Sequence, residues 1–170
     1  MAGLRFRKQS GQTMVEFALL YTGVIIPLTF GIIFISEMLW VWHSVVEFTR
    51  DGARYAATHC YQSGGPNVIT YMQANVPLMV DQNQFKLGGA TINVTYYAKD
   101  PTTGLLSDFT CATECTPDCS PDVVQISVSD YQFMRFFSFM KLPPISVPPF
   151  TTSVPMESIG CDPNVGACVP

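Results

Sequence analysis

Six cysteines are the residues of this 170-residue chain whose type and spacing offer the clearest chemistry. They are Cys60, Cys111, Cys115, Cys119, Cys161 and Cys168. An even number of cysteines is typical of disulfide-bonded proteins in oxidising compartments, whereas thiolates are also good zinc ligands. The central C-x3-C-x3-C pattern lacks the CxxC pairs and the histidine partners of usual zinc sites. The sequence therefore predicts up to three disulfides and no metal site.

The pairing of the cysteines is only partly indicated. The residues between Cys161 and Cys168 are turn-like, which predicts that these two close a loop in the C-terminal tail. Two of the three clustered cysteines would then pair with each other or with Cys60, and both arrangements stay open. We expect the disulfide-bonded loop over residues 98–122 to be the variable surface of the protein.

No catalytic constellation accompanies the cysteines. The sequence contains no GxSxG nucleophile elbow, no HExxH zinc motif and no GxxxxGK phosphate-binding loop. Its two histidines, His43 and His59, fall in one predicted helix and cannot form a hydrolytic site on their own. The sequence therefore predicts no enzymatic activity and no cofactor.

Composition narrows the class of protein. Hydrophobic residues make up 48% of the chain and charged residues 13%, whereas roughly 25% of a typical soluble domain is charged. Such hydrophobicity excludes a disordered chain. The net charge of −4 argues against nucleic acid as a partner, because phosphates would repel the protein. What remains is a very apolar globule or a small domain attached to a membrane segment.

One segment, from Phe17 to Ser36, contains no charged residue over twenty positions. A helix of that length spans about 30 Å, the thickness of the hydrocarbon core of a bilayer. The alternative is a buried helix of a soluble core, but such helices are rarely this long without a charge. Pro27 is tolerated in membrane helices and would cause a mild kink. We therefore expect a single membrane span in a lipid bilayer.

The flanking charges predict the orientation of the span. Arg5, Arg7 and Lys8 precede it, and Glu37, Glu47 and Asp51 follow it. Basic flanks stay in the cytoplasm, so the N-terminus should be cytoplasmic and the C-terminal part exported. Residues 1–11 hold three of the nine basic residues and no acidic one, which makes the rest of the chain clearly acidic. Trp40 and Trp42 stand where an aromatic belt would meet the outer membrane surface.

Helical periodicity continues beyond the apolar segment. Val41, Val45 and Phe48 recur on one side, with charged residues mostly on the other. The pattern predicts one helix from about Thr13 to about His59, roughly 70 Å long. The apolar part is too long for the hydrophobic region of a cleaved secretory signal. A helix of this length suits a subunit that packs side by side with others.

The N-terminus offers a processing signal. A short basic leader ends at the Gly11–Gln12 bond, and Glu16 occupies the fifth position after that bond, directly before the apolar run. The arrangement resembles type IV prepilin-like proteins, in which an inner-membrane prepilin peptidase cuts after the glycine. The resemblance implies cleavage between Gly11 and Gln12, and a role for Glu16 in the registration of neighbouring subunits. A carboxylate at the edge of a bilayer needs a partner, and a neighbour's new N-terminal amine would supply it. The simpler alternative is an interfacial glutamate stabilised by the helix dipole.

A second stretch, TRDGARYAA from Thr49 to Ala57, narrows the resemblance. Together with GQTMVEFALL it resembles the TadE-like proteins, the minor pilins or pseudopilins of tight-adherence (Flp-type) pilus systems. The resemblance covers residues 9–60 and, loosely, residues 120–158. Family members commonly carry an arginine near the Met156–Glu157 pair, and this chain does not.

The resemblance implies a structural or assembly component of a type IV-like pilus or secretion apparatus. Its location would be the bacterial inner membrane with a periplasmic head, or an extracellular pilus. Its partners would be other pilin or pseudopilin subunits through the long helix, the prepilin peptidase and the inner-membrane assembly platform. Two alternatives stay open, namely a signal-anchored periplasmic binding module and a subunit of another type IV-like filament.

The exported part is expected to be a small α+β head. Residues 66–75 predict a short helix, and the alternation in residues 90–98 and 123–130 predicts an antiparallel pair of strands. Asp130 should cap a helix over residues 131–142. The prolines near residues 149–156 confine a final strand to a sheet edge.

Three segments follow from these predictions. Residues 1–11 would be the leader, residues 12–60 the long helix, and residues 61–170 the cysteine-containing head.

Overall fold

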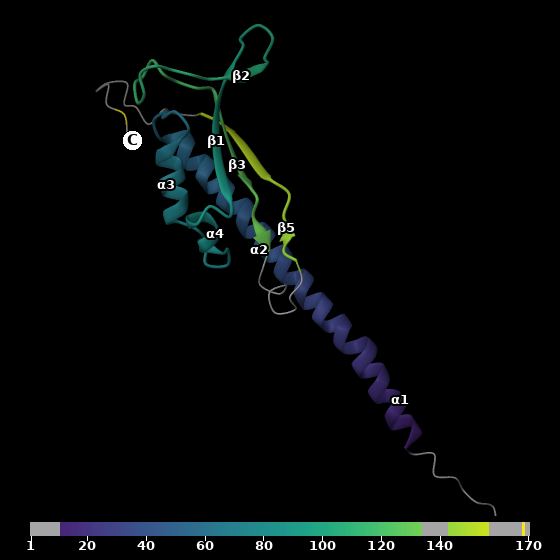
Figure 1. Ribbon diagram of the computed structural model, residues 1–170. Coiled ribbons are helices and arrows are strands. Elements are labelled where there is room, and N and C mark those ends of the chain that lie inside the picture. The colour runs from purple at the N-terminus through teal and green to yellow at the C-terminus, as the bar shows by residue number, and fades with distance from the viewer. Residues whose placement is uncertain (1–10, 134–142, 157–167, 169–170) are drawn as a thin grey trace, which may run out of the picture. The chain divides into compact units, whose positions relative to one another are not determined.

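The computed structural model describes residues 11–133, 143–156 and 168 (Figure 1). Its helical elements are α1 (Gln12–Leu20), the π-helical turn η1 (Tyr21–Ile25), α2 (Ile26–Thr58), α3 (Pro66–Ala74) and α4 (Gln82–Lys86). Its strands are β1 (Thr91–Lys99), β2 (Leu106–Asp108), β3 (Val123–Ser129), β4 (Gln132–Phe133), β5 (Ile145–Ser146) and β6 (Phe150–Pro155). The chain divides into two compact units, residues 1–40 and residues 41–170. The α+β class and the long N-terminal helix are as predicted.

Pro27 accounts for a local widening of the long helix. Proline has no backbone N–H, and its ring collides with the carbonyl oxygen four residues earlier, here that of Gly23. The preceding turn, η1, is π-helical, and the Ile26 N–H donates to the Tyr21 carbonyl oxygen five residues back. Such bulges are a known way for a helix to absorb an irregularity without ending.

The second unit contains the last part of α2, whose apolar side chains form one buried face. Val41, Val45 and Phe48 lie on this face, as the periodicity predicted. Arg50 and Glu47 form an exposed ion pair on the other side, with 2.7 Å between Nη1 and Oε1. This part of the helix is therefore stabilised by its packing in the head, and the exposed ion pair adds little.

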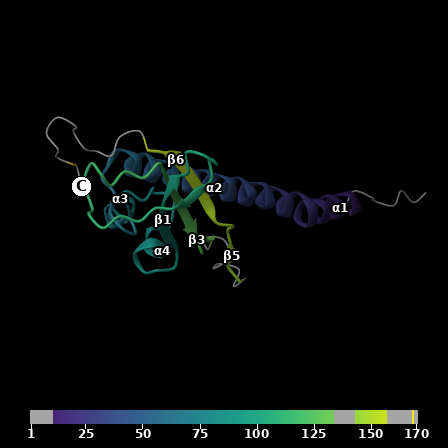
Figure 2. The ribbon, with the colours of Figure 1, turned by 90° about the horizontal axis from the view of Figure 1, so that it is seen from above.

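A four-stranded antiparallel sheet with the order β2-β1-β3-β6 lies beside α2 (Figure 2). Val94 of β1 stands opposite Ile126 of β3, which in turn stands opposite Thr152 of β6. The predicted antiparallel pair and the edge position of the last strand are confirmed. Strand β2, which pairs with the end of β1, was not predicted.

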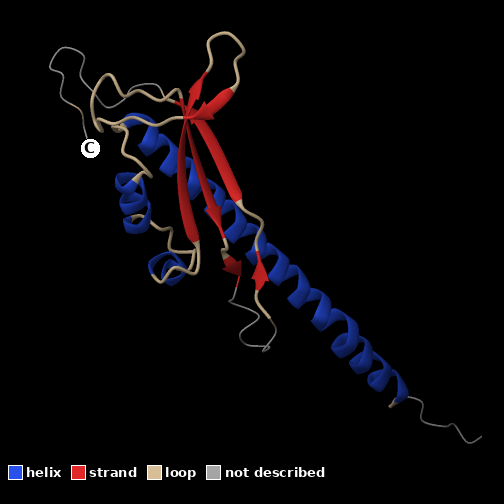
Figure 3. Ribbon diagram, turned by 45° about the horizontal axis from the view of Figure 1, so that its top comes forward, coloured by secondary structure: helices blue, strands red, loops and turns tan. Residues whose placement is uncertain are grey.

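One face of the sheet packs on the helices (Figure 3). Ile126 of β3 is fully buried and lies on this face. The hydroxyls of Thr49 on α2 and Thr152 on β6 share a hydrogen bond of 3.2 Å. Helix α3 covers the same face beside α2, because Gly65 at its N-terminus lies against Val94. The head is therefore a two-layer structure whose core lies between the helices and one side of the sheet.

Two disulfides hold the long loop between β2 and β3. Cys60, just after α2, bonds to Cys115, and Cys111 bonds to Cys119. These bonds realise both pairings that the sequence left open for the central cluster. Cys168 is also disulfide-bonded. The predicted partner of Cys168, Cys161, lies outside the described residues.

The helix predicted to start after Asp130 is wrong over its first three residues. Asp130 adopts a left-handed conformation with φ of +62°, and it does not cap a helix. Gln132 and Phe133 form β4, which pairs with β5. The buried side chain of Gln84 binds the backbone of Gln132 and holds it extended. Residues 134–142 lie outside the described part of the chain.

Candidate membrane and assembly surface

The first unit exposes an uninterrupted apolar helix. Its large side chains are all accessible, among them Phe17, Leu20, Phe30, Ile33 and Leu39. The helix from Gln12 to Thr58 is long and apolar enough to cross a membrane. No residue of its most apolar stretch of 18 residues is buried in the described structure. Soluble monomers rarely expose an apolar patch this extensive. This surface therefore needs a lipid or protein partner.

The threonine and serine hydroxyls within the apolar run donate hydrogen bonds to the helix backbone. The Thr22 hydroxyl donates to the Ala18 carbonyl oxygen at 2.7 Å, and the Ser36 hydroxyl donates to that of Ile32 at 2.8 Å. A hydroxyl paired in this way costs little free energy in an apolar environment. The segment from Phe17 to Ser36 thus fits a single-pass membrane anchor.

Glu16 lies on the first turns of this helix, in an exposed position. Its Oε1 accepts a weak hydrogen bond from Nε2 of Gln12, at 3.4 Å. No cation approaches its carboxylate within the described residues. A carboxylate near the N-terminus of a helix is favoured by the helix dipole, but that effect leaves room for a charged partner from outside the chain.

Gly11 stands at the start of the helix. Its φ and ψ of −87° and −30° are open to any residue, and an added Cβ would meet no atom within 4 Å. The Gly11 carbonyl oxygen accepts the first helical hydrogen bond, from the Val15 N–H at 3.3 Å. The fold of the described residues therefore gives no reason for a glycine at this position.

The stretch TRDGARYAA divides into packing residues and surface residues. Gly52 and Ala53 are buried, and an added Cβ on Gly52 would lie 2.5 Å from the sulfur of Met72 on α3. Arg54 and Asp51 are exposed and form an ion pair with 3.6 Å between Nη1 and Oδ1. The small residues of this stretch therefore allow α3 to approach α2 closely.

A family model described as TadE-like protein matches residues 11–54. The N-terminal segment of this chain is TadE-like. The match covers about a quarter of the chain, from Gly11 through the span to Arg54. No curated protein and no solved structure matches the chain significantly. Over these residues the chain is similar to TadE-like proteins, and the match does not extend to the head beyond Arg54.

The cysteines lie outside the TadE-like match. Cys111, Cys115 and Cys119 all have their sulfur atoms in disulfides. Over the described residues, no group of three or more histidine, cysteine, aspartate or glutamate side chains is placed to hold a metal ion. The cluster therefore acts as a brace between the end of α2 and the loop before β3.

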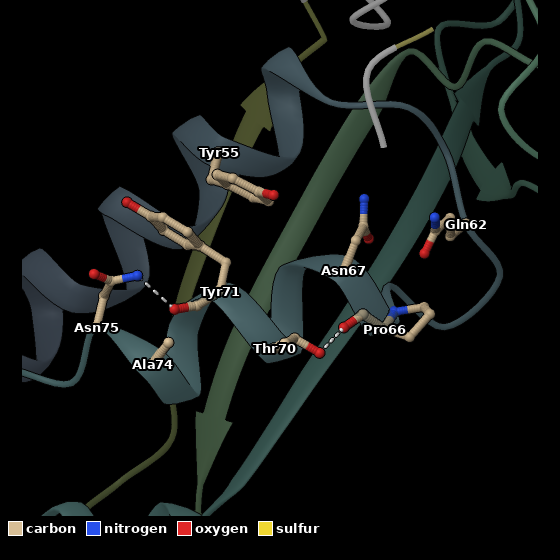
Figure 4. A pocket seen from close by; sticks show the side chains of 8 residues that line it. All are labelled: Tyr55, Gln62, Pro66, Asn67, Thr70, Tyr71, Ala74 and Asn75. Atoms are coloured by element: carbon tan, nitrogen blue, oxygen red, sulfur yellow. Dashed lines mark hydrogen bonds between the residues drawn. The ribbon is translucent and has the colours of Figure 1, made fainter.

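A shallow pocket of about 560 Å³ lies beyond the TadE-like match, between the end of α2 and α3 (Figure 4). Its residues are Tyr55, Gln62, Pro66, Asn67, Thr70, Tyr71, Ala74 and Asn75. Tyr55 stacks on Tyr71 with ring centroids 3.9 Å apart, and Asn75 donates to the Tyr71 carbonyl oxygen. Sequence reasoning missed this pocket, because its residues follow no motif. Its lining has no charged group, and its polar groups mostly bond within the chain.

Proposed function

We propose that this protein is a TadE-like minor pilin or pseudopilin, cleaved by a prepilin peptidase between Gly11 and Gln12. The TadE-like match supports association with Tad pili. Cleavage at a defined bond is what the proposal adds to that association. The observation that carries the proposal is Gly11, a glycine that neither the backbone conformation nor the surrounding space requires. A peptidase that binds an extended, side-chain-free residue beside the scissile bond supplies the missing requirement.

In this proposal, Phe17 to Ser36 span the inner membrane with the N-terminus in the cytoplasm. The three basic residues before the span and the acidic residues after it favour that orientation. The head then lies in the periplasm, where oxidising conditions maintain the disulfides, or it enters the pilus with the rest of the subunit.

Cleavage would give Glu16 its partner. The new α-amine of Gln12 is a cation at neutral pH, and the amine of a neighbouring subunit would lie at the same membrane depth as Glu16. Pairing in an apolar environment offsets the cost of burying both charges. Glu16 would thus set the register between helices whose remaining contacts are apolar.

The experiment is co-expression of the full chain with the prepilin peptidase of a Tad system, followed by mass spectrometry of the membrane-extracted protein. We expect the mature N-terminus at Gln12. The Gly11→Ala variant should keep its fold and lose cleavage. Gly23→Ala is the matched control, because an added Cβ there also meets no atom within 4 Å. An intact residue 1 in the wild-type protein, or normal cleavage of Gly11→Ala, would contradict the proposal.

A further inference from the structure

One end of the head exposes four large apolar side chains that the fold does not cover. They are Leu78, Met79, Leu87 and Ile145, called here the apolar rim. Leu78 is 87% exposed and Leu87 is 83% exposed. A single exposed leucine is ordinary, but several exposed apolar side chains at one end of a head indicate a contact surface. Leu78 and Met79 lie in the turn before α4, and Leu87 directly follows it.

The sheet register places this rim at one end of the head. Trp42 on α2 packs on Phe150, with ring centroids 4.6 Å apart. Phe150 stands opposite Val128, which stands opposite Ile92 near the start of β1. Leu87 comes shortly before this start, so it lies at the end of the sheet that contacts Trp42.

Helix α4 is fixed at the same end. Phe85 of α4 packs on Phe48 of α2, with centroids 5.3 Å apart, and on Tyr131, with centroids 5.8 Å apart. The Asp81 N–H donates to the Tyr131 hydroxyl oxygen. Strand β5, which carries Ile145, pairs with β4 just after Tyr131. The rim residues therefore lie at the same end of the head as Trp42.

The length of chain before the head identifies the partner. The second unit starts at Val41, and five helical steps separate it from Ser36, a rise of about 8 Å. The polar headgroup layer of a bilayer is of similar thickness, roughly 5 to 8 Å on each side. If Phe17 to Ser36 span the membrane, this short connection keeps Val41 and Trp42 close to the edge of the hydrocarbon core.

We propose that the apolar rim inserts into the outer interfacial layer of the bilayer that the helix crosses. The inference rests on the proposed membrane span, and it adds a second, peripheral contact with the same lipid. Lys86 is exposed beside Leu87, but Asp81 and Asp130 are exposed at the same end. The charges that the described residues place at this end thus give no net attraction to anionic lipid, so burial of apolar side chains drives the contact.

The opposite end of the head supplies a matched control. Leu105 is 70% exposed in the turn between β1 and β2. This turn is ordered, because Asp100 Oδ1 accepts hydrogen bonds from the N–H groups of Thr102 and Thr103, which lower the pKa of that carboxyl. The turn follows the C-terminal end of β1, whereas Ile92 lies near the start of that strand. Leu87 and Leu105 thus share residue type and exposure but lie at opposite ends of the sheet.

The experiment places an environment-sensitive fluorescent amino acid at position 87, 105 or 30 of the full chain in phosphatidylcholine vesicles. Nitroxide labels on the lipid headgroup or in the middle of the acyl chain then quench it. We expect headgroup quenching at position 87 to exceed that at position 105 by at least about threefold. Position 30, within the span, should be quenched by the mid-chain label. Formation of the disulfides in each variant checks the fold.

Equal quenching at positions 87 and 105, with position 30 quenched as expected, would overturn the rim contact and leave the anchor intact. Fluorescence at position 87 that changes with the protein-to-lipid ratio but is not quenched by the nitroxide labels would overturn the rim contact. The rim would then contact a second copy of the chain. Absence of mid-chain quenching at position 30 would overturn the span, and the rim contact with it.

Discussion

The side-chain amide of Gln84 binds the backbone of Gln132 as a neighbouring strand would. Its Nε2 donates to the Gln132 carbonyl oxygen at 2.7 Å, and its Oε1 accepts from the Gln132 N–H at 2.8 Å. Gln84 is buried, so both pairs are shielded from water. This relationship explains why the chain is extended after Asp130 and why α4 is fixed to β4.

Gln84→Leu should destabilise the head by about 2 to 4 kcal/mol, because it leaves two backbone groups of Gln132 without partners. Thermal unfolding of the full chain in detergent would measure the loss. Gln73→Leu is the control, since Gln73 is exposed and makes a single long hydrogen bond of 3.5 Å. Equal stability of the two variants would show that the Gln84 pairs contribute nothing.

Gln84→Glu adds a test through pH. A neutral carboxyl can donate to the Gln132 carbonyl oxygen, whereas a carboxylate cannot and would face it repulsively. The folded state should therefore raise the pKa of the new carboxyl above its unfolded value. This variant should approach wild-type stability below the unfolded pKa and lose stability as the pH rises through the folded one.

The strands that were predicted are those whose pattern is local. Val124, Ile126 and Val128 alternate with polar residues and are buried, so their period of two suffices to identify a strand. The extended segment at Gln132 depends on Gln84, which is 48 residues away. Local propensity at Asp130 therefore gave the wrong element, because a distant side chain decided its conformation.

The candidate site divides in the same way. Gly11 and Glu16 are recognisable from their spacing to the apolar run, since the processing motif is contiguous in the sequence. Leu78 and Leu87 could not be recognised from the sequence as parts of a surface, because single apolar residues in loops follow no period. Only the packing of α4 against Phe48 and Tyr131 brings them to one end of the head.

Gly65→Ala should be more destabilising than Gly64→Ala. Both glycines have positive φ, +60° and +73°, so both variants incur backbone strain. An added Cβ on Gly65 would also lie 2.7 Å from Cβ of Val94, while one on Gly64 meets nothing within 4 Å. The difference should be about 1 to 3 kcal/mol in thermal unfolding, and a difference near zero would exclude the close approach to β1.

Tyr96→Phe should leave stability unchanged or slightly higher at neutral pH. The Tyr96 hydroxyl is buried and has no hydrogen-bond partner among the described residues, so its removal loses no bond. Burial and, secondarily, Tyr61 raise the pKa of Tyr96 from 10.0 to about 12. Below pH 10 the Tyr96 hydroxyl is neutral in both the folded and the unfolded state, so its ionisation costs no stability. As the pH rises towards 12, the unfolded state ionises more readily and the head loses stability.

The effect of Tyr96 can be measured as a loss of unfolding free energy at alkaline pH. Between pH 10 and 12 the wild-type head should lose up to roughly 2 to 3 kcal/mol through Tyr96, and Tyr96→Phe should lack that part of the slope. Tyr97→Phe, at the next position on β1 and therefore on the opposite face, should keep it. Identical alkaline slopes for all three proteins would show that Tyr96 ionises as readily in the folded state as in the unfolded one.

Glu16→Ala should impair assembly while membrane insertion remains normal. If Glu16 pairs with the Gln12 amine of a neighbour in an apolar environment, its loss leaves that amine unpaired, at a cost of about 3 kcal/mol or more, which is over a hundredfold in pairwise affinity. Cross-linking of processed subunits in membranes measures assembly, and protease protection of the head measures insertion. Glu37→Ala is the control, because Glu37 is an exposed glutamate just beyond the other end of the span. Wild-type cross-linking in Glu16→Ala would reduce Glu16 to an interfacial residue held by the helix dipole, whereas a defect shared by Glu37→Ala would point to a general effect of charge at the membrane surface.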